Sequence, residues 1–252
     1  MGRLAGRCAI LTGAAYGIGF AAAKRFAEEG ASVVIADIKG HEAAVTKLTE
    51  AGLEALAVTT DVSSDASVQA LVEAVIAKYG RIDILVNNAA ISAELKPAPF
   101  ETETSDEWHR ILDVNVLGVF RMCRAVSPHM RAAKSGRIIN VTSGTAFKGA
   151  AGMLHYVASK GAVISMTRTL ANEFGADNVQ VNCVSPGFTI TESVKGSPDV
   201  MAAYSAAAIP TRFIKRDAYA PDVANVMYFL ASDDAAFVTG QTIAADGGSV
   251  MH

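Results

Sequence analysis

The sequence has few of the features that mark secreted, metal-binding or membrane proteins. Only three of its 252 residues are cysteine, and Cys8, Cys123 and Cys183 each lie in an apolar stretch without paired spacing. This usage indicates buried thiols in a reducing compartment. No Cys/His cluster has metal-ligand spacing, no apolar run approaches the ~20 residues that a membrane helix needs, and no signal-peptide core precedes the first strand-like segment. We therefore expect a soluble, cytoplasmic protein without a metal site.

The chain also lacks an excess of charge of either sign. Its 22 Lys and Arg residues against 25 Asp and Glu residues give a formal net charge of −3. This balance argues against nucleic acid or an anionic membrane surface as the main partner. With 51% hydrophobic residues the chain can bury a sizeable core, as one large α/β domain or two small ones.

Short apolar runs alternate with helical patterns along the whole chain. We expect strands at residues 7–11, 31–36, 54–59, 82–86, 136–142, 179–184 and 242–245. We expect helices at residues 20–29, 41–51, 65–79, from 105 onward, 155–174 and 221–230. Strands that are apolar throughout are typical of parallel sheets buried on both faces. The pattern predicts the α/β class, with one parallel β-sheet flanked by helices on both faces, and no linker divides residues 1–252.

The first expected strand leads into a glycine-rich turn and then into a helix. The turn reads Thr12-Gly13-Ala14-Ala15-Tyr16-Gly17-Ile18-Gly19. In this context Gly13 allows the tight turn, Gly17 lets the backbone approach a pyrophosphate, and Gly19 lets the helix pack closely on the strand. The helix N-terminus presents N–H groups and the positive end of its dipole to phosphate. An ordinary glycine-rich loop is the alternative, but the strand–turn–helix order favours dinucleotide binding.

The second expected strand ends in Asp37. A carboxylate at this position can accept hydrogen bonds from an adenosine ribose and would repel a 2′-phosphate. Ile38 follows instead of arginine, and Tyr16 stands in the turn where a basic residue would help to hold that phosphate. Both positions favour NAD over NADP, and only the charge of Lys39 opposes this interpretation.

Tyr156 and Lys160 lie four residues apart in a helical pattern, so their side chains share one helix face. An ammonium group near a phenol favours the phenolate, and a tyrosine pKa lowered from about 10 would allow general acid–base chemistry on an alcohol or a ketone. An isolated pair of this kind is usually only solvated. Its position in this chain is what favours a catalytic interpretation.

The residues alone do not decide the roles of three further polar side chains. Asp61 follows a strand and either caps the loop or hydrogen-bonds adenine. Asn115 lies in an otherwise apolar helix and, if buried, needs partners in the protein or a bound water. Ser143 follows a strand, at the sheet edge where doubly wound folds bind ligands.

The segment from Glu192 to Tyr219 shows no strong periodicity and contains Gly196, Pro198 and Pro210. A long irregular segment in a compact α/β chain is usually a lid or a binding loop. We therefore predict a substrate lid at about residues 188–219, apolar enough to cover an uncharged substrate. Its apolar residues include Val194, Val200, Met201, Ile209 and Phe213.

Together these motifs resemble the short-chain dehydrogenase/reductase family over essentially the full length of the chain. The family's order and spacing are present in Thr12-Gly13-x-x-x-Gly17-Ile18-Gly19, Asp61-Val62, Asn87-Asn88-Ala89, Asn115, Ser143, Tyr156-x-x-x-Lys160, Pro186-Gly187 and Thr191. Ala90 stands where the family usually has glycine, which should narrow the cleft slightly. The resemblance implies a single Rossmann-like domain with a doubly wound sheet, a nicotinamide cofactor, and hydride transfer between a secondary alcohol and a ketone.

The resemblance also implies roles for individual residues. Tyr156 would be the catalytic acid and base, and Lys160 would lower its pKa and hold the nicotinamide ribose. Ser143 would hydrogen-bond the substrate oxygen, and Asn115 would fix, through its backbone, a water that links Lys160 to solvent. The cofactor site would comprise Gly13, Tyr16, Gly17, Ile18, Gly19, Asp37, Ile38, Asp61, Val62, Asn88, Ala89, Tyr156, Lys160, Pro186, Gly187, Thr189 and Thr191. The substrate would face Ser143, Thr145, Met153, His155, Tyr156 and Phe188, although a histidine at a helix start is more often structural.

Our first hypothesis is an NAD-dependent secondary-alcohol dehydrogenase for aryl or alicyclic substrates, because the expected substrate-facing residues are mostly apolar. The alternative is a 3-oxoacyl-[acyl-carrier-protein] reductase, but those enzymes generally use NADPH, which Asp37 and Tyr16 disfavour. A non-catalytic NAD-binding sensor or scaffold is a third possibility, which the intact Ser143, Tyr156 and Lys160 set disfavours. The family is usually tetrameric, so we expect a homotetramer with a small-molecule substrate.

Overall fold

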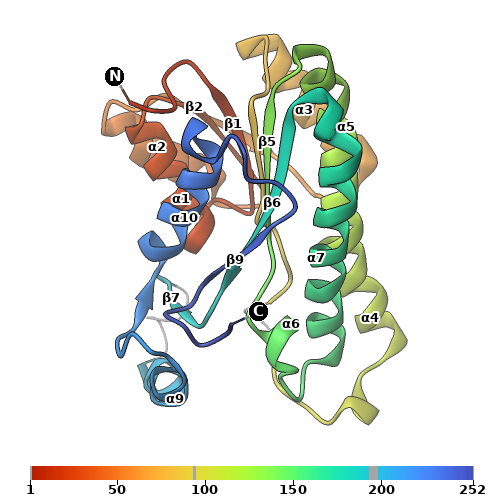
Figure 1. The fold of residues 1–252 in the computed structure, drawn as a ribbon, viewed down its shortest axis with the longest axis vertical. Coiled ribbons are helices and arrows are strands. Elements are labelled where there is room, and N and C mark those ends of the chain that lie inside the picture. Colours follow the sequence, from red (N-terminus) through yellow and green to blue (C-terminus); the bar gives the residue numbers. More distant parts are fainter. Residues whose placement is uncertain (1, 93–94, 193–197, 252) are drawn as a thin grey trace.

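A seven-stranded parallel β-sheet runs through the molecule, with helices on both of its faces (Figure 1). The computed structural model describes residues 2–92, 95–192 and 198–251. The strand order is β3-β2-β1-β4-β5-β6-β9, and each neighbouring pair is parallel. The prediction of a doubly wound α/β domain is therefore confirmed.

The elements have the following bounds. The strands of the main sheet are β1 Cys8–Thr12, β2 Ser32–Asp37, β3 Ala55–Thr59, β4 Ile84–Asn87, β5 Gly136–Val141, β6 Val179–Pro186 and β9 Thr242–Ala245. The helices are α1 Gly17–Glu28, α2 His41–Glu50, α3 Asp65–Tyr79, α4 Ser105–Leu112, α5 Gly118–Ala133, α6 Thr145–Lys148, α7 Leu154–Phe174, α9 Pro198–Ala208 and α10 Ala220–Ala231. A separate parallel pair is formed by β7 Thr189–Ile190 and β8 Ala218–Tyr219.

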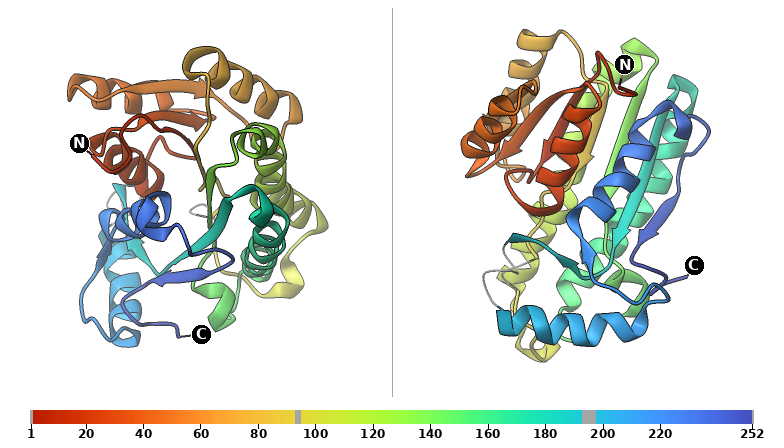
Figure 2. Two further views of the ribbon diagram at one scale, coloured as in Figure 1. Left: turned by 45° about the horizontal axis from the view of Figure 1, so that its top comes forward. Right: turned by 90° about the vertical axis from the view of Figure 1, so that its left-hand side faces the viewer.

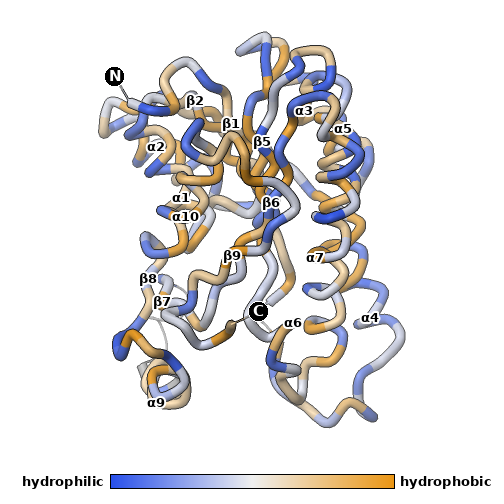
Figure 3. Tube along the Cα trace, in the orientation of Figure 1, coloured by the Kyte–Doolittle hydropathy of each residue, from blue (hydrophilic) through white to orange (hydrophobic). Residues whose placement is uncertain are grey.

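Both faces of the sheet are buried, and successive residues of one strand enter different core clusters. Ala9 and Leu11 of β1 pack in a cluster with α1, α2 and α10, whereas Cys8 and Ile10 pack in a second cluster with α3, α5 and α7. Figure 1 shows these two groups of helices on opposite sides of the sheet, and Figure 3 shows apolar residues concentrated along the central strands. Because side chains alternate along a strand, a sheet covered on both faces needs apolar residues at every position.

The strand order places a topological switch point between β1 and β4. From β1 the chain builds outward through β2 and β3, and then returns to add β4, β5, β6 and β9 on the other side. Ligands of such sheets bind in the crevice at the carboxyl ends of the strands beside this point. The glycine-rich turn after β1 and the Asn88-Ala89 segment after β4 both lie at that edge.

Two predictions of irregular structure were wrong, and one helix is less regular than expected. Helix α9 occupies residues 198–208 of the predicted lid, and Figure 2 shows it lying across one end of the molecule. Its alanines favour helix strongly but give no apolar periodicity, and Pro198 suits a first helical position. The sequence also suggests a loop from Thr145 to Leu154, but residues 145–148 form α6, and a π-helical turn at Asp113–Leu117 separates α4 from α5. Residues 193–197, including Val194 and Gly196, lie outside the described residues.

The three cysteines are buried and unpaired. Within residues 2–92, 95–192 and 198–251, no group of three or more His, Cys, Asp or Glu side chains is arranged to hold a metal ion. No helix in these ranges is long and apolar enough to cross a membrane.

Candidate active site

Tyr156, Ser143 and Thr145 meet at the carboxyl end of β5. Ser143 follows this strand, Thr145 begins α6, and Tyr156 lies in the first turn of α7. The Thr145 hydroxyl donates to Ser143 Oγ at 2.9 Å, and the Ser143 side chain is hydrogen-bonded to the Tyr156 phenol. Because Ser143 Oγ already accepts from Thr145, its own proton is directed to the Tyr156 oxygen. Thr145, predicted to face the substrate, thus orients Ser143.

Lys160 is buried beneath this group of hydroxyls, one helical turn after Tyr156. Its Nζ atom donates to the carbonyl oxygen of Val141 at 2.9 Å and lies 5.8 Å from the centre of the Tyr156 ring. The Thr142 hydroxyl donates to the Lys160 carbonyl at 2.7 Å and holds the same turn of α7 against β5. Burial lowers the pKa of Lys160 to about 8, because loss of water disfavours the ammonium.

The pKa of Tyr156 is raised in this structure, whereas the sequence led us to expect a lowered value. Burial raises the pKa of Tyr156, and the hydrogen bond to Ser143 offsets this only in part. The Lys160 ammonium is hydrogen-bonded to Val141 rather than to the phenol oxygen. The loss of water around the phenol is therefore the dominant influence on the pKa of Tyr156.

Asn115 lies in the π-helical turn between α4 and α5 and is almost fully buried. Its Oδ1 accepts from the Ile91 N–H at 2.8 Å, and its Nδ2 donates to the Ile91 carbonyl at 3.2 Å and to Ser159 Oγ at 3.1 Å. Of the two alternatives for this side chain, the structure shows protein partners. Asn115 ties the segment after β4 to α7, and π-turns often occur at functional sites.

The glycine-rich turn is packed tightly against the segment that follows β4. Gly13 has a φ of +60°, and a Cβ atom there would lie 2.6 Å from the Ala89 Cα. A Cβ atom on Gly19 would lie 2.6 Å from Asn88 Nδ2, which donates to the Gly13 carbonyl at 2.7 Å. Side chains at either glycine would therefore force apart the two strand ends at the switch point.

The N-terminus of α1 lies at the same edge of the sheet. Its N-cap, Tyr16, has extended backbone and makes no side-chain cap to the first turn. Gly17 has a φ of +58°, and a Cβ atom there would lie 3.3 Å from the Thr191 methyl group, so the turn and Thr191 face each other. An uncapped helix start bordered by glycine suits an anion, and these residues fit the pyrophosphate of a dinucleotide. Ile18 lies inside this first turn and packs on the core.

Asp37 and Tyr16 stand together at the end of β2. Asp37 Oδ2 accepts from the Ala15 N–H at 3.0 Å, which fixes the carboxylate beside the glycine-rich turn. The Tyr16 ring lies over Gly40, where a methyl group would collide with the phenol. Ile38 and Lys39 are exposed. The mouth of the crevice thus carries a fixed carboxylate and an uncharged ring.

Asp61 and Val62 lie after β3 and serve the local structure. Asp61 Oδ1 accepts from the Ser63 N–H at 2.8 Å and from the Ser63 hydroxyl at 2.6 Å. Asp61 thus caps the loop, and its hydrogen bond to adenine stays a prediction. Val62 packs against Gly118, where a Cβ atom would lie 2.8 Å from Val62 Cγ2, so it positions the start of α5.

The segment after β6 contacts both the end of β5 and helix α9. The Gly144 N–H donates to the Pro186 carbonyl at 3.0 Å, which joins the ends of β5 and β6. The Thr189 hydroxyl donates to the Gly187 carbonyl at 2.9 Å. Phe188 stacks on Tyr204 of α9, with ring centres 5.2 Å apart. Tyr204 was not foreseen, because the alanine-rich helix that carries it was not recognised.

His155 is buried at the start of α7 and turns toward the helix backbone. Its Nδ1 accepts from the Tyr156 N–H at 2.7 Å, and its ring meets that of Trp108 edge-on, with centres 6.2 Å apart. Met153, the N-cap of α7, is half-buried beside it. A second residue that sequence reasoning missed is Glu103, whose carboxylate also contacts this helix start.

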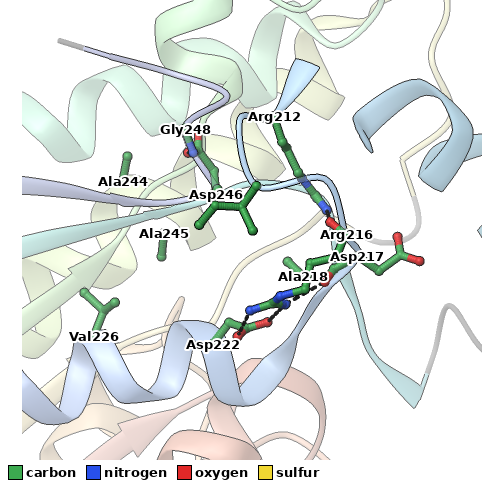
Figure 4. Close-up of a pocket in the computed structure, with 12 residues that line it drawn as sticks. Arg212, Arg216, Asp217, Ala218, Asp222, Val226, Ala244, Ala245, Asp246 and Gly248 are labelled. Carbon is green, nitrogen blue, oxygen red and sulfur yellow. Dashed lines mark hydrogen bonds and ion pairs between the residues drawn. The ribbon is translucent and has the colours of Figure 1, made fainter. Parts of the chain in front are cut away.

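A cavity of about 300 Å³ lies outside this group of residues, between residues 212–226 and residues 244–248 (Figure 4). The Arg216 guanidinium and the Asp222 carboxylate in its wall form an ion pair at 2.7 Å. Arg212 is buried and donates to the carbonyl oxygens of Arg216 and Phe188. These contacts tie Arg212 to Arg216 and to the segment that carries Phe188.

An open parallel sheet with a glycine-rich turn at its switch point, and serine, tyrosine and lysine beside it, defines a nucleotide-dependent oxidoreductase. The chain belongs to the short-chain dehydrogenase/reductase family. The family model described as Enoyl-(Acyl carrier protein) reductase matches residues 13–250.

Two relatives are similar to almost the whole chain. A 3-oxoacyl-[acyl-carrier-protein] reductase FabG of Thermotoga maritima is 39% identical over 253 residues, covering 99% of this chain and 100% of the relative. A cis-4-hydroxycyclohexanecarboxylate dehydrogenase of Sinomonas cyclohexanicum is 42% identical over 243 residues, covering 96% of each chain. The relatives thus differ in the substrates that they are named for.

Solved structures agree on the fold and differ in the cofactor. Levodione reductase superposes with a TM-score of 0.90 at 33% identity, covering 98% of this chain and 99% of its own. The 3-ketoacyl-(acyl-carrier-protein) reductase of Brucella melitensis, complexed with NADH, gives a TM-score of 0.89 at 36% identity and coverages of 98% and 100%. A protein of Beutenbergia cavernae, described as an NAD(P) dependent gluconate 5-dehydrogenase with bound NADP, gives 0.87 at 34% identity and coverages of 98% and 99%.

Proposed function

We propose that the protein is an NAD-dependent dehydrogenase that interconverts a secondary alcohol and its ketone, with an aryl or alicyclic substrate. The observation that carries this proposal is the chain of hydroxyls from Thr145 through Ser143 to Tyr156 beside the buried Lys160. It lies at the same sheet edge as the glycine-rich turn, so that one crevice can hold both the cofactor and the substrate.

A nicotinamide bound in this crevice would supply or accept the hydride. Ser143 would hydrogen-bond the substrate oxygen, and Tyr156 would exchange a proton with it. Because burial raises the Tyr156 pKa, the phenol is protonated near neutral pH, which suits proton donation to a ketone oxygen. The Lys160 ammonium stabilises the phenolate that this transfer leaves.

The choice of NAD rests on Asp37 and Tyr16. The ribose 2′-hydroxyl would find a carboxylate acceptor at the end of β2, whereas a 2′-phosphate would meet negative charge and no cation from the turn. The structural neighbours do not decide this point, because one is complexed with NADH and another carries NADP.

Apolar residues at the start of α7 and after β6 favour an aryl or alicyclic ketone. Met153 lies at the start of the same helix, and Phe188 and Tyr204 form a stacked aromatic pair between β6 and the lid. Apolar and aromatic walls suit an uncharged ring. The relative named as a cis-4-hydroxycyclohexanecarboxylate dehydrogenase acts, by its name, on a ring-bearing alcohol.

A 3-oxoacyl-[acyl-carrier-protein] reductase is the second candidate, favoured by the relative of that name in Thermotoga maritima. The two functions separate in steady-state assays that follow absorbance of the reduced nicotinamide. Turnover of 1-phenylethanol or cyclohexanol with NAD supports our proposal. Activity only with NADPH and an acetoacetyl thioester supports the carrier-protein reductase, and nucleotide binding without turnover of any alcohol points to a non-catalytic sensor.

The Tyr156→Phe substitution tests the mechanism directly. It removes the exchangeable proton while keeping the ring, so we expect kcat to fall by at least about 100-fold. NAD affinity, measured by calorimetry, should stay near that of the wild type. Tyr79→Phe, at the end of α3, is the control and should leave both quantities unchanged. Rates like those of the wild type in Tyr156→Phe would remove Tyr156 from the mechanism.

We also propose that the protein assembles as a homotetramer in the cytoplasm. Exposed apolar side chains at Leu117, Phe120 and Leu154 lie on the α4–α5 and α7 side of the molecule, where a second copy could cover them. The three buried, unpaired cysteines are typical of proteins from a reducing compartment.

A further inference from the structure

The first turn of α7, which carries Tyr156, is not capped by its own N-cap residue. Met153 occupies that position and makes no side-chain hydrogen bond to the helix, and the first turn contains no acidic residue. The first N–H groups of a helix have no partner within it and must be satisfied by other groups. The partners in this structure come from Glu103 and His155.

Glu103 supplies most of this cap from a segment far away in the sequence. Its Oε1 accepts from the Leu154 N–H at 2.8 Å, and its Oε2 accepts from the His155 N–H at 3.3 Å. The third N–H, that of Tyr156 itself, donates to His155 Nδ1 at 2.7 Å. The carboxylate is buried, with 6% of its side chain exposed, and a negative charge at this end of a helix is favourable.

His155 completes the cap as a neutral acceptor. Its Nδ1 can accept from the Tyr156 N–H only when that nitrogen carries no proton. The 3.9 Å between His155 Nδ1 and Glu103 Oε1 is too long for a hydrogen bond, so the two side chains serve different N–H groups.

A second contact joins the same two segments just before the helix. The Ala98 N–H donates to the Gly152 carbonyl at 3.0 Å, and a Cβ atom on Gly152 would lie 3.0 Å from Pro97 Cβ. The segment 97–103 therefore holds residues 152–155 at two points, one on each side of Met153. Thr104, the next residue along, caps α4 through its own hydrogen bond with Glu107.

The rest of α7 does not depend on this cap. Val163, Thr167 and Phe174 are buried along its length, and Lys160 is tied to β5 by its own hydrogen bonds. Loss of the cap should therefore loosen the first turn alone, because the free energy of local opening is lowest where tertiary contacts are few. Tyr156 lies in that turn, whereas Lys160 lies beyond it.

We propose that Glu103 is a positioning residue for the proposed reaction. It fixes the first turn of α7 from outside the helix and thereby holds the Tyr156 phenol against the Ser143 hydroxyl. This inference rests on the proposed role of Tyr156 in proton transfer. It also makes the segment 97–103, which precedes the predicted lid by many residues, part of the machinery that orients the reacting oxygen.

Glu103→Ala, Glu103→Gln and the control Glu101→Ala test this inference in the full-length protein. Glu101 lies in the same segment but is exposed. Three quantities are measured: hydrogen exchange of the Leu154–Val157 amides, NAD affinity, and kcat with an alcohol that the wild type oxidises. We expect Glu103→Ala to speed exchange in this turn and to lower kcat by about ten- to a hundredfold, as a small misplacement of a reacting group does. The NAD affinity of Glu103→Ala should match that of the wild type. The control Glu101→Ala should match the wild type in all three quantities.

Glu103→Gln should recover part of the lost rate, because its amide oxygen still accepts one of the two N–H groups. Unchanged exchange in Glu103→Ala, or faster exchange with an unchanged kcat, would overturn the inference. So would a parallel fall in NAD affinity and kcat, because that would indicate general unfolding. A wild-type protein that turns over no secondary alcohol would instead refute the proposed function, with the exchange data still reporting whether Glu103 caps the helix.

Discussion

At the scale of single residues, the Asp37 carboxylate is the group on which cofactor choice depends most. It is held beside the glycine-rich turn by the Ala15 N–H, so its charge stays at the mouth of the crevice. Tyr16 adds no cation and covers Gly40 with its ring. NADP would therefore lose the hydrogen bond that the ribose 2′-hydroxyl of NAD donates to Asp37, and its 2′-phosphate would be repelled by the same carboxylate.

We expect Asp37→Ala to weaken NAD binding by about tenfold, the value of one charge-assisted hydrogen bond. The same change should relax the exclusion of NADP, because the repelling charge is gone. Calorimetric titration with both cofactors measures the ratio of their dissociation constants. The control Lys39→Ala, two residues away on the exposed turn, should change this ratio little. An unchanged ratio in Asp37→Ala would contradict the role assigned to the carboxylate at the end of β2.

The buried Lys160 makes stability depend on pH in the alkaline range. Its pKa in the folded protein is about 8, below the ordinary value of 10.5, so between these values the unfolded chain binds more protons. The free energy of unfolding contributed by this site should therefore rise from about pH 8 to 10.5. Below pH 8 the full cost of burying the ammonium remains.

Chemical denaturation of Lys160→Met and wild type across pH 7 to 10.5 measures this effect. We expect the wild type to gain stability relative to Lys160→Met as the pH rises through that window. The exposed Lys24→Met serves as the control for general alkaline effects. A difference between wild type and Lys160→Met that stays constant with pH would contradict a depressed Lys160 pKa.

At the scale of elements, the glycine-rich turn requires glycine at position 13 both because of its backbone conformation and because a neighbouring segment packs closely against it. Gly13 combines a positive φ with a site where a Cβ atom would press on the Ala89 Cα at 2.6 Å. Gly52 also has a positive φ, of +78°, but a Cβ atom there would point into open space, with no neighbouring group within 4 Å. An alanine at Gly52 would therefore suffer only the strain of a left-handed backbone, whereas an alanine at Gly13 would also collide with Ala89.

We expect Gly52→Ala to lower the free energy of unfolding by about 1–2 kcal/mol, the cost of a left-handed conformation for alanine. Gly13→Ala should cost more, because the ends of β1 and β4 must also move apart, and it should weaken NAD binding. Denaturant titration and calorimetry measure the two effects. Equal losses of stability in the two variants would show that the contact with Ala89 is not rigid.

At the scale of the whole molecule, three large apolar side chains just before α5, within α5 and at the start of α7 are exposed in the single chain. Phe120 is 45% exposed, and Leu117 and Leu154 are exposed to a similar degree. If a second copy covered these side chains, assembly would affect the geometry of the site, because Asn115 and Tyr156 lie close to them in the chain.

Phe120→Asp should shift a homotetramer toward smaller species, because a buried carboxylate without a partner is costly at an interface. Sedimentation velocity or light scattering measures the mass in solution. Ile38→Asp, an equally drastic change at the cofactor end of the molecule, should leave the mass unchanged. A wild-type protein that is monomeric at micromolar concentration would contradict the expected assembly.

The amino-acid pattern was enough to predict the class of fold and the order of its elements, and it indicates the sheet edge at which a cofactor would bind. These features follow from local chemistry, because strands buried on both faces must be apolar throughout, and a tight turn onto a helix start needs glycines such as Gly13 and Gly19. The sequence also identified Ser143, Tyr156 and Lys160 as candidates, since strand ends and helix faces can be read from spacing. Helix α9 was not predicted, because its alanines favour a helix but give no periodic pattern that distinguishes a buried face from an exposed one.

Only the tertiary structure decided how these groups act on one another. It showed that burial raises rather than lowers the pKa of Tyr156, that Asn115 is satisfied by Ile91 and Ser159, and that Glu103 caps a helix that begins 51 residues later. Each of these facts depends on loss of water or on contact between distant segments. Desolvation and long-range hydrogen bonds are set by the packed chain as a whole, so no local pattern of residues contains them.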